Sequence, residues 1–339
     1  MSTTAAPSGR AGQSPRRRWL GLLARALTIG AIFYFLFASL VRNWGQLQGR
    51  AFTLDWRGIA LSYVVFGIYL VNRALIWHWM TRKFGCAIPL PKAMAAWFYS
   101  LLGKYVPGKV FLLAGRLHFY SQEGSSALRV SMCFALETVC ILLASVLVLL
   151  VAPLFADLAI IAQYRVPALI LVALFLVVIP PRHLERLANP LLRLARRPPI
   201  LLPLRYRDVL AMVGLFTANW TLLGLGFYLM IVAIHPLGIR YLVYLAGSFA
   251  LATTVGILAL FAPAGLGVRE AILVVALSAI MPKAMAIVVA LVSRVWMTLG
   301  EVLAVGAVAL ALRLRPAPSR PVKDSPPESE CREGAGING

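Results

Sequence analysis

The chain has 339 residues, of which 60% are hydrophobic and only 13% are charged, and its formal net charge is +21. Soluble domains of this size rarely exceed about half apolar residues, whereas several apolar runs here approach the roughly 20 residues needed to cross a bilayer. The composition excludes a soluble enzyme and indicates an all-α, polytopic membrane protein.

The basic residues lie mainly in the connections between apolar runs, which is typical of the positive-inside bias of membrane proteins. Nucleic-acid binding would require basic residues interleaved with exposed aromatic residues, and the sequence has no such stretch, so we expect no nucleic-acid partner. The cysteines form no CxxC motif or Cys/His cluster, and we interpret them as small buried hydrophobes. They are Cys86, Cys133, Cys140 and Cys331. No metal, disulfide or other cofactor is expected.

Three regions are predicted from the composition. Residues 1–18 and 316–339 are polar, rich in small residues or proline, and predicted to be disordered. Residues 19–315 form the predicted transmembrane domain. The basic patch before the first apolar run resembles a signal peptide, but the run is long and no A-x-A site follows it. We therefore expect an uncleaved first span.

About six stretches are predicted to be full helical spans. They are residues 20–41, 58–80, 129–152, 166–180, 208–235 and 284–312. The fourth stretch is short and can extend back through "LAIIAQYR". Residues 182–197 repeat leucine at helical spacing with arginine on the other face, which is typical of an amphipathic helix on the membrane surface. Because Pro190 interrupts this pattern, a plain basic linker is the alternative.

The arginines predict the orientation of the chain. The loop 181–208 contains seven arginines against Glu185 and Asp208, and "RRR" at residues 16–18 precedes the first span. Both termini should therefore be cytoplasmic in a bacterial inner membrane. Three arginines between residues 42 and 57 would then lie outside, which counts against this scheme.

Two further segments, residues 90–119 and 241–281, read as broken helical hairpins. In the first, both apolar legs are too short to cross about 30 Å of hydrocarbon, and in the second only the first leg is long enough. If each segment returns to its own side, the first enters from the cytoplasm and the second from outside. Two broken segments entering from opposite faces are typical of inverted-repeat transporters.

Proline and glycine mark each break, and charged residues surround it. The first break is Pro107-Gly108, flanked by Lys104 and Lys109; the second is "PAGLG" with Pro263, Gly265 and Gly267, followed by Arg269 and Glu270. Non-helical backbone at membrane depth is tolerated only against protein or a water-filled cavity. A helix that starts after such a break directs free N–H groups into that cavity, where they favour an anion. In a membrane, the expected anion is a lipid phosphate, which Arg116 and Arg269 would help to bind. The alternative is that such cations are snorkelling interfacial anchors.

Only 12 residues are acidic, and Glu137, Glu270 and Glu301 fall in membrane segments. A carboxylate there is costly unless it is paired or hydrated, so each is a functional candidate, with a structural ion pair as the alternative. Glu301 lies two turns from Arg294 on the same helical face. These two residues are expected either to share an intermediate group or to have separate partners such as Arg269 and Glu270. The chain has no P-loop and no G-x-S-x-G motif, so we expect no enzyme.

Two motifs, "GKYVPGKVFLLAGR" at residues 103–116 and "PAGLGVRE" at 263–270, resemble the signatures of the flippase-like membrane domain of lysylphosphatidylglycerol synthases. The resemblance covers residues 20–312. It implies movement of a lipid between leaflets, and it implies a role for Pro107, Gly108 and Arg116 in the first motif. In the second motif it implies roles for Pro263, Gly265, Gly267, Arg269 and Glu270. This chain has no synthase domain, so aminoacylation is not implied. Lys109 and Val110 depart from the family's first motif, which often has a second glycine and an acidic residue there.

The sequence therefore favours a lipid translocase whose substrate carries a phosphate-containing headgroup. The headgroup would lie between the two breaks, with Arg269, Arg294, Glu270 and Glu301 among its binding residues. One alternative is a non-transporting scaffold for a lipid-modifying glycosyltransferase, which would dock on the loop 181–208. Another is an integral membrane transferase in which Glu137 or Glu270 acts as a base.

Overall fold

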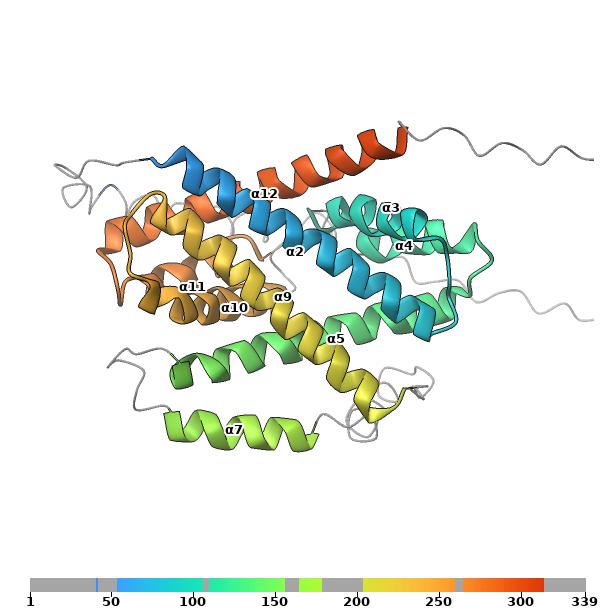
Figure 1. The fold of residues 1–339 in the computed structure, drawn as a ribbon, viewed down its shortest axis with the longest axis horizontal. Coiled ribbons are helices and arrows are strands. Elements are labelled where there is room, and N and C mark those ends of the chain that lie inside the picture. The colour runs from blue at the N-terminus through green and yellow to red at the C-terminus, as the bar shows by residue number, and fades with distance from the viewer. Residues whose placement is uncertain are drawn as a thin grey trace, which may run out of the picture.

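The structure is a computed structural model that describes Val41 and residues 54–105, 110–155, 165–178, 204–259 and 265–313. Within these ranges the regular elements are helices and no strand is present, which confirms the predicted all-α class (Figure 1). Among the described residues, five segments are long and apolar enough to cross a membrane. They are α2 (Trp56–Lys83), α5 (Ala127–Phe155), α9 (Tyr206–Val232), the pair η3 (Ile239–Tyr241) and α10 (Leu242–Leu258), and α12 (Lys283–Arg313).

Four of the predicted spans, 58–80, 129–152, 208–235 and 284–312, correspond to α2, α5, α9 and α12, with ends shifted by one to three residues. The predicted span 20–41 and the predicted surface helix 182–197 lie outside the described residues, except for Val41. The stretch predicted at 166–180 corresponds to α7 (Arg165–Val178). Its 14 residues reach only about 21 Å, less than the hydrocarbon thickness.

Local hydrogen bonds fix where the long helices begin. The carboxylate of Asp55 accepts from the backbone N–H of Arg57 at 3.0 Å and caps the start of α2. The carboxylate of Asp208 accepts from the backbone N–H of Arg205 at 3.1 Å at the start of α9. These polar caps satisfy backbone donors that would otherwise lack partners at the helix ends.

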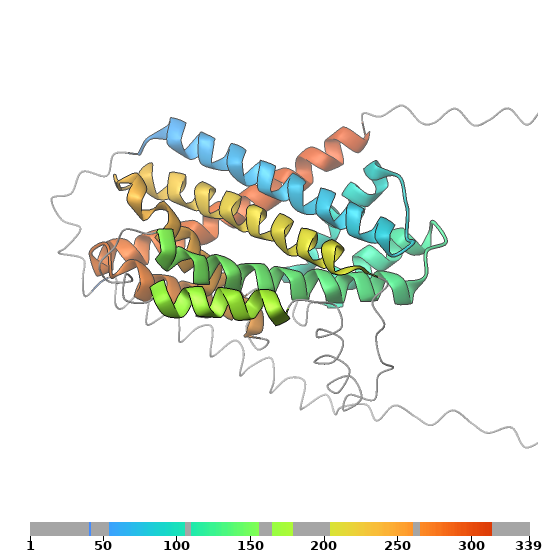
Figure 2. The ribbon, with the colours of Figure 1, turned by 60° about the horizontal axis from the view of Figure 1, so that its bottom comes forward.

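The two predicted hairpins are helix pairs. The first consists of α3 (Leu90–Leu101), η2 (Leu102–Tyr105) and α4 (Val110–Ser121), and the second of α10 and α11 (Val268–Leu277). Both views show α3 and α4 toward one end of the long helices and α10 and α11 toward the other (Figures 1 and 2). The unequal lengths predicted for the second hairpin are confirmed, because α10 has 17 residues and α11 only 10.

Close approaches of small residues hold the bundle together. A Cβ added at Gly224 of α9 would lie 2.3 Å from the Cβ of Ala246 on α10, so only glycine permits this crossing. Cys133 and Cys140 on α5 are buried, as the sequence predicts. Large aromatic side chains such as Trp77, Phe66 and Phe227 fill the remaining space of the core.

Candidate functional site

The tips of both hairpins converge on one stretch of α12. At the first tip, the ammonium group of Lys104 in η2 forms an ion pair with the carboxylate of Glu301. At the second tip, Arg269 donates to the hydroxyl of Ser293 at 3.1 Å. Arg294 lies 3.8 Å from Glu270. We call Lys104, Arg269, Glu270, Arg294 and Glu301 the tip cluster.

The second break has the backbone that its glycines predict. Gly265 and Gly267 adopt φ values of +68° and +83°, a region that residues with side chains rarely occupy. Gly265 packs against Gly256 of α10 so closely that an added Cβ would lie 2.7 Å from the Gly256 Cα. Gly265 therefore lies directly against α10, and α11 begins deep in the protein. Pro263 lies outside the described residues.

Glu270 neutralises the start of α11. Its Oε2 accepts from the backbone N–H of Gly267 at 2.7 Å, and its Oε1 lies 3.2 Å from a guanidinium nitrogen of Arg269. The side chain is fully buried. We expected this helix terminus to offer N–H groups to a lipid phosphate, but at Gly267 the donor already binds the protein's own carboxylate.

Arg269 is 2% exposed and has three kinds of partner. It contacts Glu270 and Ser293 through its terminal nitrogens, and its guanidinium lies 4.6 Å from the ring centroid of Phe249. Its Nε is buried with no hydrogen-bond partner among the described residues. The guanidinium is thus fixed in direction while one of its donors stays available.

The first break brings Lys104 to the same place. Gly103 lies directly against the backbone of Phe111 and Leu112, because an added Cβ would lie 2.7 Å from the Leu112 N. This contact folds η2 onto α4 and places Lys104 beside Glu301. Lys104 and Arg269 each interact electrostatically with both Arg294 and Glu301. Pro107 and Gly108 lie outside the described residues.

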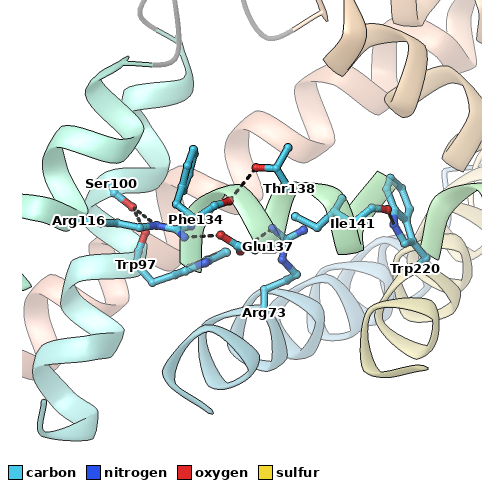
Figure 3. A network of polar contacts seen from close by, with 9 residues as sticks. All are labelled: Arg73, Trp97, Ser100, Arg116, Phe134, Glu137, Thr138, Ile141 and Trp220. Carbon is cyan, nitrogen blue, oxygen red and sulfur yellow. Dashed lines mark hydrogen bonds and ion pairs between the residues drawn. The ribbon is translucent and has the colours of Figure 1, made fainter. Parts of the chain in front are cut away.

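A second buried group of charges lies on α2, α4 and α5 (Figure 3). Glu137 of α5 forms ion pairs with Arg73 of α2, at 3.2 Å, and with Arg116 of α4. Arg116 also donates through Nε to the hydroxyl of Ser100 at 3.3 Å. We call Arg73, Arg116 and Glu137 the arginine pair cluster. We expected Arg116 to hold the same phosphate as Arg269, but its described ion-pair partner is Glu137, so it belongs to a separate group.

Aromatic rings enclose the arginine pair cluster. The guanidinium of Arg116 lies 4.0 Å from the ring centroid of Trp77 and 5.2 Å from that of Phe134. The ring of Trp97 has both guanidiniums nearby, with Arg73 at 5.8 Å and Arg116 at 6.0 Å. Cation–π contacts of this kind are worth more when the cation is desolvated, so they help to keep two like charges close together.

The two clusters together contain five cations and three carboxylates. Their side chains are at most 22% exposed. Among the described residues, the two clusters thus contain two more cations than carboxylates, and a group of cations held this close together is suited to an anion.

The structure brings four of the predicted site residues together: Arg269, Glu270, Arg294 and Glu301. Arg294 and Glu301 have separate acidic and basic partners, one of the two arrangements that the sequence predicts. The sequence predicts that Lys104 adds positive charge near the break, but it does not predict the ion pair of Lys104 with Glu301. Ser293 and Ser100 were missed, because an isolated serine in an apolar helix carries no distinctive signal. The hydroxyl of Ser293 donates to the backbone carbonyl of Ala290, and the hydroxyl of Ser100 donates to that of Trp97.

The sequence matches the family described as "Lysylphosphatidylglycerol synthase TM region" over residues 12–315. No curated protein matches the chain closely enough for comparison. The long apolar helices and the family match together show a multi-pass membrane protein, from a family linked to lipid modification. The match spans nearly the whole chain and includes both broken hairpins, so the chain belongs to the lysylphosphatidylglycerol synthase transmembrane-region family.

Proposed function

We propose that the chain is a flippase-like lipid translocase of the bacterial inner membrane and that it has no enzymatic activity of its own. Its substrate is a lipid, anionic or modified, with a phosphate-containing headgroup. The observation that carries this proposal is the meeting of three cations and two carboxylates, all largely buried, where the two hairpin tips converge. Several cations held together at membrane depth form a favourable site for the phosphate of a lipid.

In this proposal the headgroup lies beside the tip cluster, with its acyl chains in the bilayer. Lys104, Arg269 and Arg294 contact the phosphate, and the available Nε of Arg269 supplies one donor. Glu270 and Glu301 hold these cations in position, as their ion pairs do in the structure. Gly265 and Gly267 allow the backbone to leave the helix, and Pro107, Gly108 and Pro263 keep the role that the sequence motifs predict. A positively charged headgroup would instead contact the two carboxylates.

The proposed topology has both hairpins re-entrant, from opposite faces, and both termini cytoplasmic. Ion pairs join helix ends at one end of the bundle. Lys83 at the end of α2 pairs with Asp208 at the start of α9, and Lys92 at the start of α3 pairs with Glu123 just after α4. The first hairpin begins and ends at this end. Arg82, Arg129, Arg205 and Arg207 lie in the same terminal turns. The positive-inside rule favours this end as the cytoplasmic one.

The test is lipid movement in proteoliposomes that contain only the purified full-length protein. Phosphatidylglycerol with a fluorescent acyl chain is reconstituted, and an impermeant reductant then bleaches the probe in the outer leaflet. Transport predicts bleaching well beyond the half seen with empty vesicles. Arg294→Gln should slow the bleaching beyond this half, which reports lipid arriving from the inner leaflet, at least tenfold. Lys92→Gln, which removes the same charge from an exposed ion pair, should leave it unchanged.

The alternative of a scaffold for a glycosyltransferase makes the opposite prediction. A scaffold would move no lipid in this assay, and Arg294→Gln would leave the binding of its partner intact. Bleaching limited to the outer leaflet with the wild-type protein, across vesicles of different lipid composition, would therefore refute transport.

A further inference from the structure

The arginine pair cluster has unused hydrogen-bond donors. Trp97 is 2% exposed, and its indole Nε1–H has no partner among the described residues; the same holds for the Nε–H of Arg73. A buried donor without an acceptor loses its hydration and gains nothing in return. Glu137 supplies one carboxylate for two guanidiniums, and both of its oxygens are already engaged.

These features belong together in space. The Trp97 ring centroid lies within 6.0 Å of both guanidinium carbons, so the ring and the two arginines that pair with Glu137 are close neighbours (Figure 3). The group has two positive charges, one negative charge and at least two idle N–H donors. A tetrahedral oxyanion has the charge and the acceptor oxygens that this set lacks.

The cluster also lies at a different depth from Arg294 of the tip cluster. Arg73 is ten residues from the end of α2, and Glu137 is ten residues from the start of α5, which places both about 15 Å from the basic end of the bundle. Arg294 is eleven residues from the start of α12, which lies at the opposite end. Tyr69, one turn from Arg73, interacts electrostatically with Arg73, Glu137 and Glu301.

We propose that Arg73, Arg116 and Trp97 form a second binding site for a phosphate group, which a lipid headgroup occupies before or after it occupies the tip cluster. The inference rests on the proposed transport function, since it assigns a second binding site to the same lipid substrate. The phosphate accepts from the idle donors of Arg73 and Trp97, and Glu137 keeps the two guanidiniums from separating while the site is empty.

The experiment measures how many equivalents of dihexanoyl-phosphatidylglycerol the purified full-length protein binds by calorimetry. Two equivalents are expected for the wild type, one for Arg73→Gln and one for Arg294→Gln. Dihexanoylglycerol, which has no phosphate, should not compete. Two full equivalents with Arg73→Gln would overturn the second site. Two equivalents of inorganic phosphate with no binding of the lipid would overturn its assignment to a headgroup.

If Arg73→Gln does not fold, two more conservative variants, which change no charge, test the inference. Trp97→Phe removes an idle N–H and should weaken one of the two equivalents about tenfold. Trp220→Phe is the matched control, because its indole already donates to the carbonyl of Ile141 at 3.2 Å and should not affect lipid binding. Equal affinities in these two variants would refute a role for the Trp97 donor.

The second site and the transport function can fail separately. If Arg294→Gln stops lipid movement while Arg73→Gln leaves both movement and two-site binding intact, transport stands and the second site is refuted. If the wild type binds two equivalents but moves no lipid, the site stands as a phosphate site and the translocase is refuted.

Discussion

The contact between Gly256 and Gly265 makes the second break sensitive to a single methyl group. Replacing Gly265 with alanine would put a Cβ 2.7 Å from the Cα of Gly256 and 2.9 Å from its carbonyl carbon and oxygen. Ordinary contacts begin near 3.4 Å, so α10 and the break must separate by about 0.7 Å. The three obstructing atoms are backbone and cannot rotate away.

Two penalties add in Gly265→Ala. Alanine at φ +68° costs roughly 1–3 kcal/mol of backbone strain, and overpacking of a filled core costs about another 1–3 kcal/mol. The expected loss of about 2–6 kcal/mol is a large part of the total stability of a typical domain. Because Arg269 and Glu270 follow the break directly, the tip cluster is displaced as well.

Thermal unfolding of the purified protein, followed by size-exclusion fluorescence, measures this loss. We expect the midpoint of Gly265→Ala to fall by at least about 4 °C and its lipid movement to be impaired. Gly256→Ala is the control from the other side of the same contact. Its Cβ would lie 3.3 Å from the Cβ of Arg269 and 3.4 Å from the Cα of Gly265, and alanine favours the helix by up to about 1 kcal/mol. Equal midpoints for the two variants would refute the reasoning.

Three further predictions concern the packing and the buried charges. Gly224→Ala should separate α9 from α10 and lower the unfolding midpoint. Ala246→Gly in the same chain removes the contact at 2.3 Å but leaves the Ala246 Cα at 2.8 Å, so it should recover only part of the loss. Gly214→Ala, with nothing within 4 Å of its Cβ, should be tolerated. Glu137→Gln should lower the free energy of unfolding by about 3–5 kcal/mol, because two buried guanidiniums lose their shared counter-charge. Glu123→Gln, at a partly exposed ion pair, should lower it by at most about 1 kcal/mol. Comparable losses in the two variants would contradict the argument from burial. Asn72 donates to Asn219 at 2.9 Å between α2 and α9, and a double-mutant cycle with alanine should give a coupling of about 0.6 kcal/mol; a coupling of zero would show that the bond adds nothing.

The sequence was sufficient to predict the long helices and the second break, because both depend on local patterns. Apolar length predicts α2, α5, α9 and α12, and the glycines at 265 and 267 predict a backbone that leaves the helix. Helical periodicity places Arg294 and Glu301 on one face of α12. These features need no knowledge of which helices are neighbours.

Partner choice could not be predicted in the same way. Arg116 pairs with Glu137 and not with the Arg269 group, because α4 packs against α5 and brings these two side chains together. The partnership of Lys104 with Glu301 joins residues 197 positions apart. Both depend on the tertiary arrangement of the hairpins, for which the sequence offers several equivalent pairings of five cations with three carboxylates.

Both hairpin tips are attached to α12 within little more than two helical turns, through Ser293 and Arg294 on one side and Glu301 on the other. A helix is stiff over so short a length, so a tilt or rotation of α12 displaces both attachments together. A motion of α12 that breaks the contacts of one tip therefore also shifts the residues that contact the other tip. The positions of the two hairpins are thus linked through a single helix.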